Sequence, residues 1–152
     1  MNTETEMTAE TEMTAGTGTT PKDVVVRYVR AVADGDLATI RDSFAEDATW
    51  TYPGDLPLSG TWKGRDAIVD DFLGAATGGL FKPGTAPEVA LVNVIAEGDQ
   101  VLAEWTAKGI TRSGRIYDNR CAGIYVVRDG RIVSVKEYAD TQHVERTLFG
   151  QR

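Results

Sequence analysis

The second half of the chain contains segments in which apolar and polar side chains alternate, and short polar triplets separate them. The segments are residues 88–96, 101–111, 116–127 and 131–139, and the triplets are Glu97-Gly98-Asp99, Arg112-Ser113-Gly114 and Arg128-Asp129-Gly130. A period of two residues is typical of strands with one buried face, and short loops that contain glycine join antiparallel neighbours. This part of the sequence therefore predicts a meander of antiparallel strands.

Helical patterns precede these strands. Thr20 and Pro21 fit the cap and first turn of a helix, which continues to about Val32 with apolar residues at helical spacing. Asp34-Gly35-Asp36 interrupts the pattern, and a second helix is expected over residues 37–44. A short strand over 50–52, a third helix from residue 64 and a loop over 74–87 complete this half. Helices followed by an antiparallel sheet give the α+β class.

Residues 1–20 are acidic and rich in threonine, and they repeat the motif Glu-Thr-Glu-Met-Thr-Ala. The segment has no aromatic or β-branched aliphatic residue, so it cannot contribute to a core. We therefore predict a disordered tail over residues 1–20 and a single domain over residues 21–152.

Charge and composition exclude several classes of function. The net charge of -7 and the sequence pI near 4.7 argue against nucleic acid and anionic membrane as partners. No apolar run approaches the roughly 20 residues that span a bilayer, and residues 1–20 lack the pattern of a signal peptide, so a cytoplasmic protein is expected. With one cysteine and one histidine, the sequence predicts no internal disulfide, no metal site and no cofactor.

Glu137 lies on the strand over residues 131–139, where it shares one face with Val133, Val135 and Ala139. A carboxyl group among apolar neighbours has a raised pKa, and this property suits an acid or base catalyst. A two-residue turn at Asp129-Gly130 would place Ala122, Ile124 and Val126 beside Glu137. A three-residue loop would instead place Asn119, Cys121, Gly123 and Tyr125 there, and the sequence leaves both registers open.

Several short motifs follow one another between residues 24 and 149. They are Tyr28-Val29-Arg30-Ala31-Val32 with Asp34-Gly35-Asp36-Leu37, Phe44-Ala45-Glu46-Asp47-Ala48-Thr49, Gly64-Arg65-Asp66-Ala67-Ile68, Asp129-Gly130-Arg131-Ile132 and Glu137-Tyr138-Ala139-Asp140. In this order they resemble the SnoaL-like branch of the nuclear transport factor 2-like superfamily, which includes ketosteroid isomerases, limonene epoxide hydrolases and polyketide cyclases.

The resemblance implies a cone-shaped α+β barrel, in which N-terminal helices pack in a curved antiparallel sheet and close one end of a pocket. It favours the three-residue loop, which puts Glu137 inside that pocket. It also matches Tyr28 to the tyrosine that donates a hydrogen bond to the oxyanion in ketosteroid isomerases, whereas Tyr52 and Gly123 stand where those enzymes have aspartates.

Comparison with limonene epoxide hydrolases gives a second partial match. Glu137 takes the place of one aspartate of their pocket, and Glu104 and Thr106 stand where an arginine and the other aspartate are expected. Trp50 and Tyr52 replace the residues that hold the attacking water. The resemblance thus keeps an acid or base at Glu137 and gives little support to a hydrolytic water.

The predicted catalytic residues are Glu137 as the proton carrier and Tyr28 and Tyr52 as hydrogen-bond donors. The predicted substrate-binding residues are Trp50, Trp62, Phe72, Glu104, Thr106, Asn119 and Cys121. Structural alternatives stay open: Glu137 in an ion pair with Lys108 or Arg120, Glu104 on the solvated face of the sheet, Asn119 bonded to a neighbouring strand, and the aromatic residues as core.

The function predicted from these residues and the resemblance is that of a cofactor-independent isomerase or cyclase. Its substrate would be a hydrophobic small molecule, such as a polyketide or terpenoid intermediate, with epoxide opening as one route to the ring. The alternatives are an epoxide hydrolase like the limonene enzymes and a non-catalytic ligand-binding or assembly domain. The resemblance also implies a homodimer formed through the outer face of the sheet.

Overall fold

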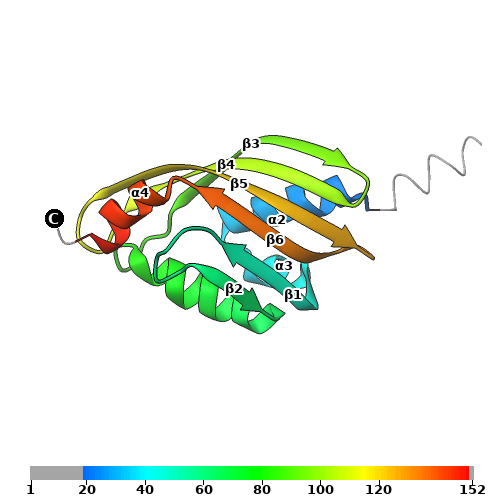
Figure 1. The fold of residues 1–152 in the computed structure, drawn as a ribbon, viewed down its shortest axis with the longest axis horizontal. Coiled ribbons are helices and arrows are strands. Elements are labelled where there is room, and N and C mark those ends of the chain that lie inside the picture. The colour runs from blue at the N-terminus through cyan, green and yellow to red at the C-terminus, as the bar shows by residue number, and fades with distance from the viewer. Residues whose placement is uncertain (1–18, 151–152) are drawn as a thin grey trace, which may run out of the picture.

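The computed structural model describes residues 19–150, in which six strands form one sheet that curves over a layer of helices (Figure 1). The spatial order of the strands is β2-β1-β6-β5-β4-β3. Their bounds are Phe44–Tyr52 for β1, Gly60–Lys63 for β2, Glu88–Glu97 for β3, Gln100–Ile110 for β4, Ile116–Arg128 for β5 and Arg131–Ala139 for β6. The predicted tail lies outside the described residues except for its last two positions.

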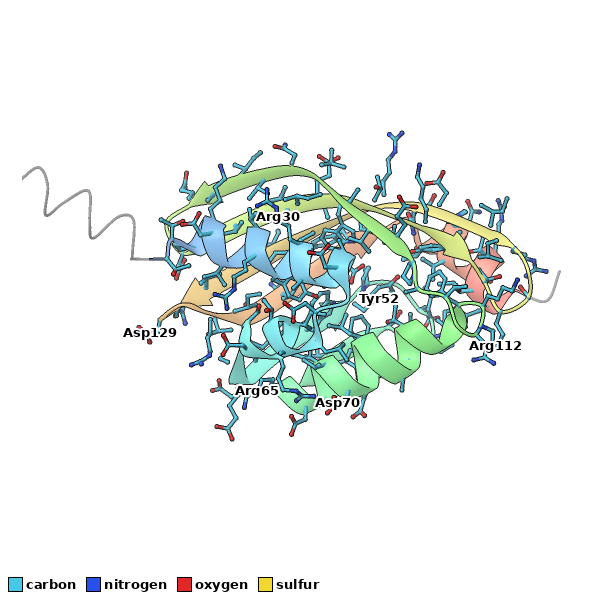
Figure 2. All side chains as sticks on the ribbon, turned by 180° about the vertical axis from the view of Figure 1, so that it is seen from behind. Arg30, Tyr52, Arg65, Asp70, Arg112 and Asp129 are labelled. Carbon is cyan, nitrogen blue, oxygen red and sulfur yellow. The ribbon has the colours of Figure 1, made fainter. Side chains whose placement is uncertain are left out.

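The helices lie on one face of this sheet and at one end of it. They are α2 (Pro21–Asp34), α3 (Leu37–Asp42), the π-type helix η1 (Ala67–Thr77), the short turn η2 (Gly78–Leu80), and the C-terminal pair α4 (Thr141–Val144) and η3 (Glu145–Phe149). Seen from the helix side, α2, α3 and η1 cover the concave face, and Tyr52 lies in the middle of that face (Figure 2). The predicted α+β fold, with N-terminal helices packed in a curved sheet, is confirmed.

Local signals at both ends of α2 explain its bounds. The Thr20 hydroxyl accepts from the Asp23 backbone N–H at 3.1 Å, and the Asp23 carboxylate accepts from the Thr20 N–H, so each residue caps the other. Gly35 ends the helix with a φ of 71°, a left-handed conformation that glycine adopts without steric cost. The apolar stripe of α2 is thereby held against the sheet.

The sheet contains one pairing that the sequence did not predict. Strand β1 lies parallel to β6, with Trp50 opposite Val135, while β3, β4, β5 and β6 form the expected antiparallel meander. β1 begins at Phe44, well before the short strand expected at residue 50, because Ser43 and Phe44 are already fixed at the edge of β6. The Ile132 N–H donates to the Ser43 carbonyl at 2.8 Å.

Two further segments differ from expectation. β2 occupies part of the stretch expected to be irregular, where it pairs with β1, and helix η1 with η2 fills half of the expected loop over 74–87. Arg41 at the end of α3 pairs with Asp66 at 2.7 Å and also with Asp70 on η1. These contacts are on the surface, so they fix the approach of η1 to α3 more than they add stability.

Candidate active site

A cavity of about 300 Å³ lies between the concave face of the sheet and the helices. Its walls come from α2, α3, η1 and the inward residues of β1, β4, β5 and β6. Most of the lining is aromatic or aliphatic, and Glu137 is the one ionisable carboxyl or basic side chain among the described lining residues. A concave apolar site with few polar groups is the usual form of a small-molecule pocket.

Glu137 reaches the cavity from β6 and is half-buried there. The Trp50 indole Nε1 donates a hydrogen bond to its Oε1 at 3.1 Å. Burial raises the pKa of the Glu137 carboxyl to about 8, and the Trp50 hydrogen bond opposes that rise. No ion pair with Lys108, Arg120 or another cation involves Glu137 within residues 19–150. The ion-pair alternative is therefore not what the structure shows.

The register of the β5–β6 hairpin combines features of both expected connections. Arg128 pairs with Arg131, so the turn has two residues, and Asp129 and Gly130 both have the positive φ, 51° and 78°, that a tight hairpin turn requires. The register then shifts, because Val127 pairs with Ile132 and Val126 pairs with Ser134, which leaves Val133 as an extra residue.

This β-bulge changes which residues of β6 face the core. Glu137 pairs with Gly123, and Val135 and Ala139 lie on its face, as expected from alternation. The expectation that Val133 shares the face of Glu137 is wrong. Val133 is the extra residue of the bulge, and Ile132 is the buried residue that precedes Val135 on the inward face. The inward neighbours of Glu137 are thus those predicted for a three-residue loop, although the loop itself has two.

Tyrosine hydroxyls provide most of the remaining polar groups of the cavity. Tyr28 and Tyr52, the predicted donors, both line it, and so do Tyr117 and Tyr125 on β5. Burial raises the pKa of all four phenols, and the charge of Glu137 adds to the rise in each, so they surround that carboxyl at electrostatic range. The described residues form no hydrogen bond with the hydroxyls of Tyr28, Tyr52 or Tyr125.

Sequence reasoning missed Tyr117 as a site residue. It lies on the inward face of β5 with Asn119, Cys121, Gly123 and Tyr125, so the two-residue period was the signal that could have found it. Gly123 leaves room for the neighbouring rings, because a Cβ there would lie 2.8 Å from the Tyr125 ring.

The structure brings some of the predicted substrate-binding residues to the cavity and separates others from it. Trp50, Phe72 and Cys121 line the wall, and burial together with the Glu137 charge raises the pKa of the Cys121 thiol to about 12. Trp62 lies behind Phe72, with ring centroids 5.3 Å apart, and its Nε1 donates to the Leu58 carbonyl.

Glu104 and Thr106 are not pocket residues, contrary to prediction. They alternate along β4 with the buried residues Ala103, Trp105 and Ala107, so they point to the outer face of the sheet. The alternative, in which Glu104 belongs to that solvated face, is the one observed. The cavity therefore has no second carboxylate from β4.

Asn119 is buried but does not line the cavity. Its amide bonds to the backbone of Asp140 and to the Tyr117 hydroxyl. Asp140 caps α4, because its carboxylate accepts from the His143 N–H at 3.1 Å. The residues at this end of the sheet therefore support the cavity from outside.

Within residues 19–150, no three His, Cys, Asp or Glu side chains come close enough together to hold a metal ion. In the same part of the chain, no helix has the length and hydropathy needed to cross a membrane.

Comparison with known proteins agrees with this geometry. Residues 25–135 match the SnoaL-like domain family. An uncharacterized protein of Mycobacterium tuberculosis is 34% identical over 128 residues, which cover 81% of this chain and 92% of that protein. Two solved structures share the fold at lower identity.

The first is an NTF2-like protein from Burkholderia thailandensis, with a TM-score of 0.76, 24% identity, and coverage of 86% of this chain and 98% of that one. The second, from Jannaschia, is provisionally classed as a SnoaL-like polyketide cyclase, with a TM-score of 0.70, 17% identity, and coverage of 87% and 93%. The curved sheet, the apolar cavity and the family match lead to one conclusion: the chain belongs to the SnoaL-like family of the NTF2-like fold.

Proposed function

We propose that the protein is a cofactor-independent enzyme of the isomerase or cyclase kind, and that it acts on a hydrophobic small molecule. In this proposal Glu137 moves a proton, and Tyr28 and Tyr52 donate hydrogen bonds to the substrate oxygen on which negative charge develops. The observation that carries the proposal is a carboxyl group that has no cationic partner within residues 19–150, lies in an aromatic cavity and has its pKa raised to about 8.

The raised pKa makes both protonation states of Glu137 available near neutral pH. At pH 7 a group with a pKa of about 8 is mostly protonated, and roughly one tenth of it is ionised. The ionised form takes a proton from a C–H next to a carbonyl, and the acid that results returns it at another carbon. Proton transfer by a positioned side chain contributes about 10² to 10⁴ in rate.

The phenols of Tyr28 and Tyr52 supply the second effect. Both residues line the cavity, and neither hydroxyl has a hydrogen-bond partner among the described residues, so each can donate to a substrate oxygen. A preorganised donor to a developing oxyanion contributes about 10² to 10³ in rate. Together with Glu137 these donors suit an enolisation, or a ring closure that the folded substrate already favours.

The cavity lining supports an apolar substrate and does not support epoxide hydrolysis. A hydrolytic mechanism of the kind weighed above needs an arginine and a second carboxylate beside the attacking water. Neither residue type occurs among the described lining residues apart from Glu137 itself. A homodimer through the outer sheet face stays a prediction.

The experiment uses 2-tetralone, a bicyclic ketone with acidic C–H groups next to its carbonyl. Exchange of these hydrogens for deuterium in D₂O is followed by NMR with the wild type, with Glu137→Gln, and with Glu104→Gln as a control on the opposite face of the sheet. We expect wild-type catalysis that rises with pH up to about 8, loss of at least about 100-fold in Glu137→Gln, and no change in Glu104→Gln.

Equal exchange by the wild type and Glu137→Gln would refute the role of Glu137. Binding of 2-tetralone by the wild type without any exchange above the buffer rate would instead favour a non-catalytic ligand-binding domain.

A further inference from the structure

Tyr117 is the one tyrosine of the cavity whose hydroxyl has a protein partner among the described residues. The Asn119 Nδ2 donates a hydrogen bond to this hydroxyl at 3.1 Å. Both residues are buried, and they point to the same side of β5. The direction of this bond decides what the Tyr117 hydroxyl can offer to a ligand.

The backbone of Asp140 fixes the orientation of the Asn119 amide. The Asp140 N–H donates to Asn119 Oδ1 at 3.3 Å, and the Asp140 carbonyl accepts from Asn119 Nδ2 at 3.3 Å. A backbone N–H can only donate, and a backbone carbonyl can only accept, so the amide cannot be reversed without losing both bonds. Asn119 must therefore present an N–H, and not its oxygen, to Tyr117.

The Tyr117 oxygen consequently acts as an acceptor on the side of Asn119. A phenol has a single hydrogen, which lies near the ring plane on one of two sides, so the hydrogen of Tyr117 points away from Asn119. Cys121 offers one acceptor for this hydrogen, because a side-chain hydrogen bond from the Tyr117 hydroxyl to the Cys121 sulfur contributes to the pKa of both groups, but sulfur is a weak acceptor. A carbonyl or enolate oxygen in the cavity is a stronger acceptor than this sulfur and would take the hydroxyl hydrogen from it.

The Tyr117 ring is held in this position by packing on two sides. The Phe81 ring meets it edge to face with centroids 5.5 Å apart, and the His143 ring lies at 5.4 Å. His143 is itself fixed, because its Nε2 accepts from the Asp118 backbone N–H at 3.0 Å. Preorganisation of this kind lowers the cost of binding a ligand.

We propose that Tyr117 binds the substrate directly, by donating a hydrogen bond to a carbonyl or enolate oxygen, and that Asn119 is the positioning residue that directs this donor. The inference rests on the proposed function only in the choice of an oxygen-bearing apolar ligand. It adds a third phenol to Tyr28 and Tyr52, and it is the only one of the three whose direction is set by a described protein contact.

The probe is 2-naphthol, whose ionised oxygen resembles the enolate of 2-tetralone and whose two protonation states absorb at different wavelengths. Its affinity and its pKa in the bound state are measured with the wild type, with Tyr117→Phe, and with Tyr138→Phe as a control. Tyr138 is 51% exposed and lies on the same sheet, outside the cavity lining. We expect Tyr117→Phe to fold, because Asn119 Nδ2 retains the Asp140 carbonyl as its acceptor.

We expect Tyr117→Phe to bind 2-naphthol about 10-fold or more weakly and to raise the pKa of the bound naphthol, because one donor to the charged oxygen is lost. Tyr138→Phe should match the wild type. Asn119→Asp should behave like Tyr117→Phe, since a carboxylate would accept the Tyr117 hydrogen; if this variant does not fold, Tyr117→Phe decides alone.

Unchanged affinity and unchanged naphthol pKa in Tyr117→Phe would overturn the inference, as would a wild type that does not bind 2-naphthol. The outcome is separate from that of the proposed function. If Tyr117→Phe weakens naphthol binding but the wild type catalyses no tetralone exchange, the binding role of Tyr117 is supported and the proposed enzyme is refuted. If tetralone exchange depends on Glu137 while Tyr117→Phe binds naphthol like the wild type, the proposed enzyme is supported and the binding role of Tyr117 is refuted.

Discussion

Glu137→Gln should change how the stability of the protein depends on pH, and the size of the change follows from the cavity. The folded-state pKa of Glu137 is about 8, whereas the ordinary value is 4.5. Between these two values the folded chain keeps a proton that the unfolded chain has released. Stability from this group is therefore fully present below about pH 4.5 and is lost as the pH rises towards 8.

The free energy of unfolding should fall by about 1.4 kcal/mol for each pH unit in this window, or on the order of 4 kcal/mol between pH 5 and 8. Water that enters the cavity solvates the carboxylate, so this total is an upper bound. Glutamine has nearly the same shape, does not titrate, and keeps an oxygen that can accept from Trp50 Nε1. The free energy of unfolding of the variant should match that of the wild type within about 1 kcal/mol at pH 5 and exceed it by several kcal/mol at pH 8.

Urea denaturation at pH 5, 6, 7 and 8, at one protein concentration and followed by far-UV circular dichroism, measures both free energies. The difference between the two proteins at each pH removes the titration of all other groups. Glu104→Gln controls for the loss of one negative charge from the opposite face of the same sheet. If the free energies of unfolding of the wild type and Glu137→Gln change in parallel with pH, the reasoning is refuted. If the wild type instead becomes more stable relative to the variant as the pH rises, the folded protein stabilises the carboxylate form of Glu137.

Other substitutions test the packing around the site. Trp50→Phe removes the hydrogen bond that lowers the pKa of Glu137, so this pKa should move above 8. The pH–rate profile of tetralone exchange should then shift to higher pH. Gly123→Ala should force the Tyr125 ring from its place, cost about 1–3 kcal/mol in urea denaturation and weaken naphthol binding; unchanged binding would contradict it. Thr20→Ala removes the cap of α2 and should cost about 1 kcal/mol without affecting naphthol binding.

Local patterns were sufficient to predict most of the fold. The cap at Thr20, the left-handed Gly35 and the two-residue period of β4 and β5 each act within a few residues, so the sequence reveals them directly. The parallel pairing of β1 with β6 depends on segments far apart in the chain, and no local signal marks it. For the same reason the sequence does not reveal β2, which pairs with β1 alone among the described strands.

The site depends on the β-bulge at Val133, which is a local feature of β6 but is favoured by packing in the core. Ile132 and Val135 lie an odd number of residues apart, so a regular strand would put them on opposite faces. Both are nearly inaccessible to solvent, at 0% and 1% exposure, and the extra residue Val133 is what allows this. Burying a side chain of this size contributes about 1.5–3 kcal/mol, so the bulge is favoured over a regular strand. Without it Glu137 would pair with Ala122 and leave the cavity, while Lys136 would face the apolar wall. The same packing energy that buries two aliphatic side chains therefore turns the carboxyl group of Glu137 inward.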